Sequence, residues 1–219
     1  DAPTTTVTLN GGSYSKVTAT TATNTLIIGE GVTIEELVIE GGNVVLKGNV
    51  ESILSTVVAT TVSLEADVTL ANACTISGDV TLDMGGETIT APQGAFVVAD
   101  GTFTIKNGTI NANVKGYDAV AIKGATESSV IKVNVEEDAT LKGGDCCVVV
   151  YGSNKSKDIT INTAGTLVTE SAYESSSYPG YAAISANGKS EGVKLNVTGG
   201  SITAKVAAIY FPCSTTLTI

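Results

Sequence analysis

The chain has 219 residues, with 12 lysines, no arginine, no histidine and 22 Asp or Glu, so its formal net charge is −10. An acidic chain without arginine argues against nucleic-acid binding, because phosphate neutralisation and base reading depend on clusters of Arg and Lys. The absence of histidine excludes Ser-His-Asp and Cys-His catalysis and histidine-ligated zinc.

The composition favours β-strands. Thr, Val and Ile supply 75 residues (32, 26 and 17), and β-branched side chains fit a pleated, half-buried surface. At 42% hydrophobic and 16% charged, the chain can bury a large core as a single domain of residues 1–219. It has no run of about eighteen apolar residues, which argues against membrane insertion. Its first residues predict the start of a mature or trimmed chain, and abundant Thr, Ser, Gly and Asn suggest a secreted or cell-surface protein.

Apolar-x-apolar triplets recur every six residues in the middle of the chain. Each triplet predicts a short strand with two inward side chains and one outward Ser or Thr between them. Strands this closely spaced are too short for hairpins but suit a chain that coils around a prism. The triplets are Val62–Leu64, Val68–Leu70, Cys74–Ile76 and Val80–Leu82.

The C-terminal half repeats on a longer period, with three strand-like segments per unit. The first segment is small and apolar. The second segment alternates apolar with polar residues and predicts an outward ladder of Thr, Lys and Asn. The third segment is a small residue followed by Thr or Ser and then by an aliphatic residue. For the first segment we align Val97, Ile122, Val149, Ile184 and Ile209, which are 25, 27, 35 and 25 residues apart. The outward ladder would hold Lys132 and Asn134, Thr160 and Asn162, and Lys194 and Asn196.

This repeat predicts an all-β fold, a right-handed parallel β-helix (solenoid) of about nine coils with little or no helix. Residues 1–94 would form shorter, less regular coils, and residues 95–219 would form three-strand coils of about 25–35 residues. Uneven coil lengths favour the right hand. The last coil is incomplete after Leu217–Ile219. Because solenoid ends need caps, we expect further chain or a partner to cover this coil.

One unit carries an insertion of about ten residues, and an insertion in one coil forms a loop on one face. The inserted segment 169–181 contains three of the seven tyrosines, and Tyr210 alternates outward from Ile209. Exposed aromatic faces beside carboxylates can stack on sugar rings and bind their hydroxyls, although the tyrosines could instead pack the loop onto its coil. The predicted ligand-binding residues are Tyr173, Tyr178, Tyr181, Tyr210, Glu170 and Glu174.

Asp118 and Asp145 each lie four residues before the aligned residue of their unit, Ile122 and Val149. They would then stack on adjacent coils at about 5 Å, a separation that suits calcium or a retaining carboxylate pair. Solvated turn aspartates are the third interpretation. Calcium is the one cofactor that the sequence suggests.

Four cysteines leave the redox compartment open. Cys146 and Cys147 are adjacent, so on a strand they point to opposite faces. Buried thiols are one interpretation. A disulfide from Cys146 or Cys147 to Cys213 is the second, and metal ligation is the third.

Three further segments carry a recognisable pattern of turn and core residues: Val80–Thr90, Gly101–Ile110 and Ala207–Pro212. They resemble the pectin-lyase-like right-handed β-helix repeats of large bacterial surface proteins, including those of gut bacteria. The likeness covers roughly residues 60–219. It implies a β-helix and a surface location, and the enzymes that share this fold cleave polysaccharides with arginine, lysine or histidine beside aspartates.

We therefore expect a non-enzymatic bacterial surface or secreted protein, either adhesin-like, glycan-binding or structural, with a glycan or host-surface ligand as its partner. Two alternatives stay open. The chain could be a polysaccharide lyase or glycosidase that uses Asp118 and Asp145, or a segment of a phage tail fibre or spike.

Overall fold

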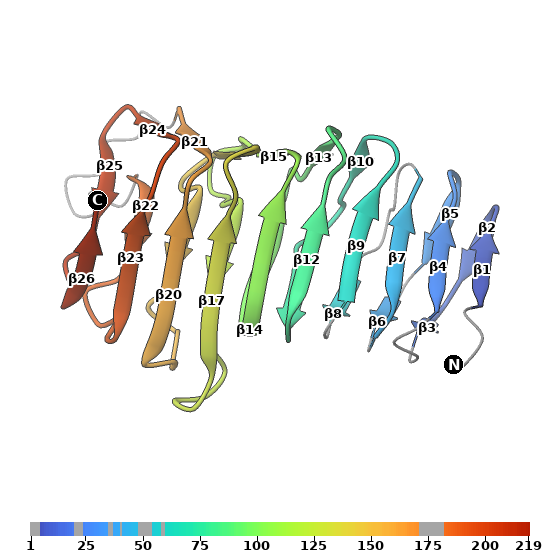
Figure 1. Cartoon of the computed structure of the whole chain (residues 1–219), viewed down its shortest axis with the longest axis horizontal. Helices are drawn as coiled ribbons and strands as arrows, with labels where there is room; N and C mark the ends of the chain where they lie inside the picture. The colour runs from blue at the N-terminus through green and yellow to red at the C-terminus, as the bar shows by residue number, and fades with distance from the viewer. Residues whose placement is uncertain are drawn as a thin grey trace.

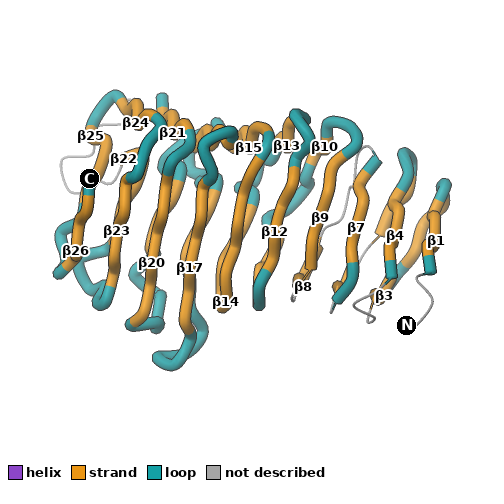
Figure 2. The backbone as a smooth tube through the Cα atoms, viewed as in Figure 1, coloured by secondary structure: helices purple, strands orange, loops and turns teal. Residues whose placement is uncertain are grey.

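The computed structural model describes residues 5–19, 24–34, 37–39, 41–47, 54–57, 60–170 and 182–219. These residues form twenty-six β-strands and no helix, and the strands pair in parallel. Figure 1 shows the strands of one face side by side along the long axis, from the blue N-terminal end to the red C-terminal end. In Figure 2 the loops gather along the edges of this row. No helix in the described residues is long and apolar enough to cross a membrane.

The strands line three faces, and each strand pairs with its equivalent one coil further on. The first face holds β1 (Thr6–Leu9), β4 (Thr25–Ile28), β7 (Asn43–Leu46), β9 (Thr60–Leu64), β12 (Val80–Asp83), the second half of β14 (Phe96–Lys106), β17 (Val130–Val135), β20 (Asp158–Thr163), β23 (Val193–Val197) and β26 (Thr215–Thr218). The second face holds β10 (Val68–Thr69), β13 (Thr88–Thr90), β15 (Gly108–Ala112), β18 (Ala139–Gly143), β21 (Thr166–Thr169) and β24 (Ser201–Ala204).

The third face holds β3 (Val17–Ala19), β6 (Leu37–Ile39), β8 (Leu54–Val57), β11 (Cys74–Ser77), the first half of β14, β16 (Val120–Ile122), β19 (Val148–Val150), β22 (Ala182–Ala186) and β25 (Ala207–Tyr210). A separate pair joins β2 (Gly12–Tyr14) to β5 (Val32–Ile34). The described residues confirm an all-β chain of parallel strands in stacked sheets, and this arrangement is consistent with the predicted β-solenoid.

Columns of aliphatic and aromatic side chains fill the interior. On the first face, the inward residue of each strand pairs with the inward residue of the next coil, from Val80 through Phe103, Val133 and Ile161 to Leu195, and each is almost completely buried. Each such side chain contributes about 1.5–3 kcal/mol by leaving water. The two halves of β14 meet inside, because the rings of Phe96 and Phe103 lie 4.9 Å apart. One shared core therefore supports all three faces.

The outward ladder is confirmed on the first face. The amide of Asn134 donates to the hydroxyl of Thr104 at 3.0 Å. The amide of Asn162 donates to Asn134, and that of Asn196 to Asn162, both at 2.8 Å. These side chains bond one another from coil to coil, so the column has a structural role.

The alignment of the third face is off by one residue in part of the chain. Ile122 pairs with Val98 and Val150, whereas Val97 pairs with Ala121 and Ala121 with Val149. The alignment of Ile184 with Ile209 is confirmed. The slip arises because β19 is apolar at every position, so alternation cannot tell its inward residues from its outward ones.

Aspartates at the corners tie neighbouring coils together. The carboxylates of Asp67, Asp79 and Asp100 accept from backbone N–H groups 21 to 30 residues further along the chain, at 2.8–3.0 Å. Each of these bonds satisfies a donor where a loop interrupts the strand ladder. These three aspartates therefore have a structural role at the corners.

The first and last coils leave inward-facing residues open. Val7 of β1 is 48% exposed, and Leu217 of β26 is also 48% exposed although it continues the buried column of Leu195. Ile219 is 87% exposed.

Candidate functional site

A groove of about 240 Å³ lies over the outer surface of the third face. Its lining includes Val97 and Ala121, which are outward residues of β14 and β16, and three loops surround it. The loop after β15 contributes Tyr117 and Asp118, the loop before β14 contributes Gln93, and Tyr151 follows β19 directly. The groove therefore combines apolar surface, two phenol rings and one carboxylate.

Both carboxylate oxygens of Asp118 accept hydrogen bonds. Its Oδ1 accepts from the backbone N–H of Cys146 at 2.9 Å, and its Oδ2 accepts from the hydroxyl of Tyr151 at 2.7 Å. Burial raises the pKa of Asp118 to about 6, against the opposing effect of these bonds, and the nearby charge of Asp145 adds to the rise. Perturbed carboxyl groups in clefts are more common at functional sites than elsewhere.

The two tyrosines keep part of their rings in solvent. Tyr117 is 37% exposed and Tyr151 is 40% exposed. Burial raises the pKa of Tyr151, and the charge of Asp118 raises it further, so its hydroxyl stays protonated and donates to Asp118. Both rings can therefore contact a ligand in the groove.

The structure places Asp118 and Asp145 on neighbouring coils but one residue out of register. The backbone N–H of Asp145 donates to the carbonyl of Tyr117 at 2.9 Å, while Asp118 bonds the backbone of Cys146. The Asp145 carboxylate accepts from the N–H of Gly116 at 2.8 Å and is not part of the groove lining. The described residues contain no group of three or more Cys, Asp or Glu side chains that could hold a metal ion. Calcium at this pair stays a prediction.

Most of the predicted tyrosine site cannot be placed. Tyr173, Glu174, Tyr178 and Tyr181 lie outside the described residues. Glu170 follows β21 and is exposed. Tyr210 is half-buried on β25, where it pairs with Ser185.

The predicted Cys146–Cys213 disulfide is not formed. The four cysteines all lie in described residues, and none is joined to another. Cys146 precedes β19 and Cys213 follows β25, which is two strand spacings or about 9.5 Å away across the sheet. Disulfides span only about 4.4–6.8 Å between Cα atoms. Cys74, Cys146 and Cys147 are buried, and burial raises the pKa of all three thiols, that of Cys147 to about 12.

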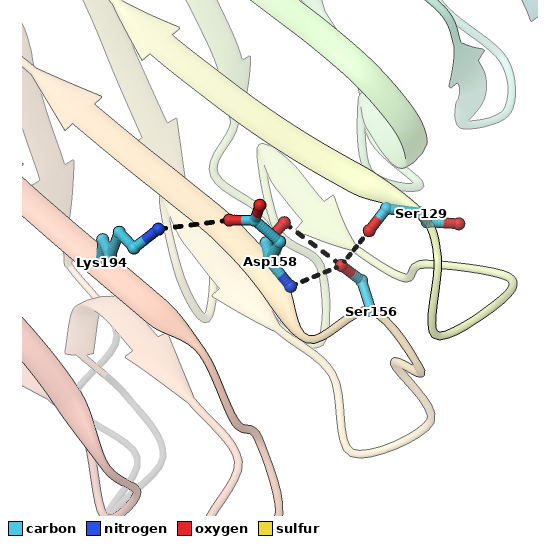
Figure 3. A network of polar contacts seen from close by, with 4 residues as sticks. All are labelled: Ser129, Ser156, Asp158 and Lys194. Carbon is cyan, nitrogen blue, oxygen red and sulfur yellow. Dashed lines mark hydrogen bonds and ion pairs between the residues drawn. The ribbon is translucent and has the colours of Figure 1, made fainter.

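A second cavity, of about 260 Å³, lies between the loop after β19 and the loop before β23. Figure 3 shows the polar network beside it: Ser156 donates to the carbonyl of Ser129 at 2.6 Å and accepts from the N–H of Asp158 at 3.2 Å. Lys194 approaches Asp158 at 3.4 Å. This network joins loops of successive coils and has a structural role.

A third, wider cavity of about 570 Å³ follows the corner around Asn107. The amide of Asn107 donates to Asp83 at 2.9 Å, and its backbone N–H donates to Asp138 at 3.0 Å. The polar groups of this corner already bind one another, and it offers no aromatic side chain.

The sequence pointed to Asp118 but missed Tyr117, Gln93 and Tyr151. An available signal was the tyrosine that directly follows the apolar run Val148–Val150, since it breaks the alternation of the repeat with a large polar-tipped ring.

No family model matches the chain, and neither a curated protein nor a solved structure matches it.

Proposed function

We propose that this chain is a non-enzymatic, right-handed β-helix of about nine coils from a bacterial cell-surface or secreted protein, and that it binds glycans. The observation that carries the proposal is the groove in which Tyr117 and Tyr151 accompany the carboxylate of Asp118. The resemblance to surface β-helix repeats and the Thr- and Asn-rich exterior support the location.

The groove has the chemistry that a sugar ring requires. Sugar rings present C–H faces that pack on aromatic rings, and hydroxyl groups that need acceptors and donors. Both oxygens of Asp118 accept hydrogen bonds within the protein. Because a carboxylate offers about four lone-pair sites, it can also accept a bond from a ligand hydroxyl. At about 240 Å³ the groove is smaller than a drug-sized pocket of about 300–1,000 Å³, which suits one ring of a longer chain.

The same proposal includes a covered C-terminal coil. Leu217 leaves apolar surface open at the end of the interior column that contains Leu195. Further protein stacked on β26 would bury this surface and satisfy the strand edge.

A glycan array probed with the purified protein tests the proposal. We expect binding that Tyr117→Ala and Tyr151→Ala each weaken, while Tyr14→Ala, at the distant N-terminal end, leaves it unchanged. The Tyr210→Ala variant separates this groove from the site predicted around the inserted segment. Absence of binding by the parent protein, or binding that survives both groove substitutions, would defeat the proposal.

A glycosidase is the second candidate, because a carboxyl group with a pKa of about 6 can act as a general acid beside a second carboxyl group. Asp118 would donate the proton and Asp145 would act as the second carboxylate. Release of reducing ends that disappears in both Asp118→Asn and Asp145→Asn would replace the binding proposal with this one.

A further inference from the structure

We infer that the groove of Tyr117, Asp118 and Tyr151 selects a glycan that carries a cationic amine, such as an amino sugar without its N-acetyl group. This inference rests on the proposed glycan binding and specifies the ligand class. It is carried by the balance of charge in the groove and by the placement of the two rings.

None of the described residues that line the groove carries a positive charge to pair with Asp118. Its hydrogen-bond donors, the backbone N–H and thiol of Cys146 and the hydroxyl of Tyr151, are all neutral. Among the described residues that line the groove, Asp118 is the only charged one. Lys115 belongs to the same loop, but it is exposed and is not part of the lining.

The surroundings of Asp118 strengthen the negative potential. Asp145, on the neighbouring coil, is close enough for its charge to act on Asp118. The Cys146 thiol stays protonated and neutral, because burial raises its pKa. A cation in the groove would therefore meet one carboxylate directly and a second one nearby.

Tyr117 and Tyr151 provide the second attraction. Both tyrosines line the groove and are partly exposed, so a cation bound there can contact them. A cation held near an aromatic face gains an electrostatic attraction that a neutral acetamide lacks. Hydrogen bonds that involve a charged group are also stronger than neutral ones.

Three glucosamine oligomers of equal length, with free, N-acetylated or N-trimethylated amines, separate charge from shape. Measured by calorimetry near neutral pH, the free-amine and trimethylated oligomers should bind at least about tenfold more tightly than the acetylated one. In the Asp118→Asn variant the amide oxygen can still accept from the N–H of Cys146, but the negative charge is gone. This variant should therefore lose the preference for the cationic oligomers over the acetylated one. Tyr117→Ala should weaken both cationic oligomers.

The net charge of −10 would attract any cationic oligomer weakly, so a matched control is needed. Asp67→Asn removes the same charge at a corner outside the groove lining and should keep the preference. An equal loss in Asp67→Asn and Asp118→Asn would overturn the inference. Equal or tighter binding of the acetylated oligomer would also overturn it, yet would leave the proposed glycan binding intact. Lysine amide acetylated on its α-nitrogen keeps a cationic side-chain amine but is not a sugar. If it bound more tightly than a single glucosamine, the assignment of the ligand to a sugar would be overturned.

Discussion

The hydroxyl of Tyr151 donates a 2.7 Å hydrogen bond to Oδ2 of Asp118, although the two residues are 33 positions apart in the chain. The bond joins the end of β19 to the loop before β16, and these strands pair on the third face. The pairing of β16 with β19 therefore brings a phenol and a largely buried carboxylate to one groove.

Asp118→Asn should change how stability depends on pH. The carboxyl has a pKa of about 6 in the folded chain and 3.8 as its reference value, so the folded state binds the proton more tightly. The stabilising contribution of this group is present below about pH 4 and is lost as the pH rises through 6. The difference corresponds to at most about 3 kcal/mol. Urea unfolding of the parent protein and of Asp118→Asn, near pH 4 and near neutral pH, measures this contribution. The variant should lack the loss of stability that the parent shows as the pH rises.

If the difference in unfolding free energy between the parent protein and Asp118→Asn were the same at both pH values, the prediction would be wrong. Asp67→Asn is the matched control, because that carboxylate also accepts from a backbone N–H of the neighbouring coil.

Tyr151→Phe should raise the pKa of Asp118 above about 6. The Tyr151 hydroxyl bonds the ionised carboxylate and lowers its pKa, so its removal favours the protonated form. A lost hydrogen bond to a charged group costs about 1.5–3 kcal/mol, which denaturant unfolding can measure. Carboxyl chemical shifts followed by NMR would report the pKa directly, and a value at or below that of the parent would contradict the prediction.

Binding of a trimethylated glucosamine oligomer should weaken as the pH falls from 7 to 5. The ligand charge does not titrate, so the change reports Asp118, which passes from carboxylate to neutral acid around its pKa of about 6. The other titratable groups around Asp118 are Tyr151, Cys146 and Asp145. Burial raises the pKa of Tyr151 and of Cys146, so both stay protonated from pH 7 to pH 5. Calorimetry with Asp118→Asn should give an affinity that does not change over this range, and the same decrease in that variant would rule Asp118 out.

The alternation of apolar and polar residues made the first face predictable. The ladder of Asn134, Asn162 and Asn196 could be read from the sequence, because each strand there has one apolar and one polar side. The groove could not be read in this way. Tyr117 and Tyr151 line one groove only through the register of β16 and β19. Because β19 is uniformly apolar, that register was misplaced by one residue.

Gly101→Ala should destabilise the fold far more than Gly31→Ala. Both glycines have left-handed backbone conformations, with φ of +79° and +74°, so alanine is strained about equally at each, by about 1–2 kcal/mol. They differ in space. A Cβ at Gly101 would lie 2.4 Å from the backbone of Gly78, at the corner where β14 turns from the third face to the first, whereas a Cβ at Gly31 would meet no atom within 4 Å.

The backbone of Gly78 can move only if the hydrogen bond from its N–H to the carbonyl of Asp100, at 3.0 Å, is disturbed. We therefore expect an additional loss of about 1–3 kcal/mol at Gly101, the usual cost of overpacking, on top of the strain that both variants share. Chemical denaturation of the two variants measures the difference between them. Equal destabilisation by Gly101→Ala and Gly31→Ala would mean that the corner at Gly78 relaxes freely. In that case the strand register that places Tyr151 beside Asp118 would not depend on close contact between the corners of neighbouring coils.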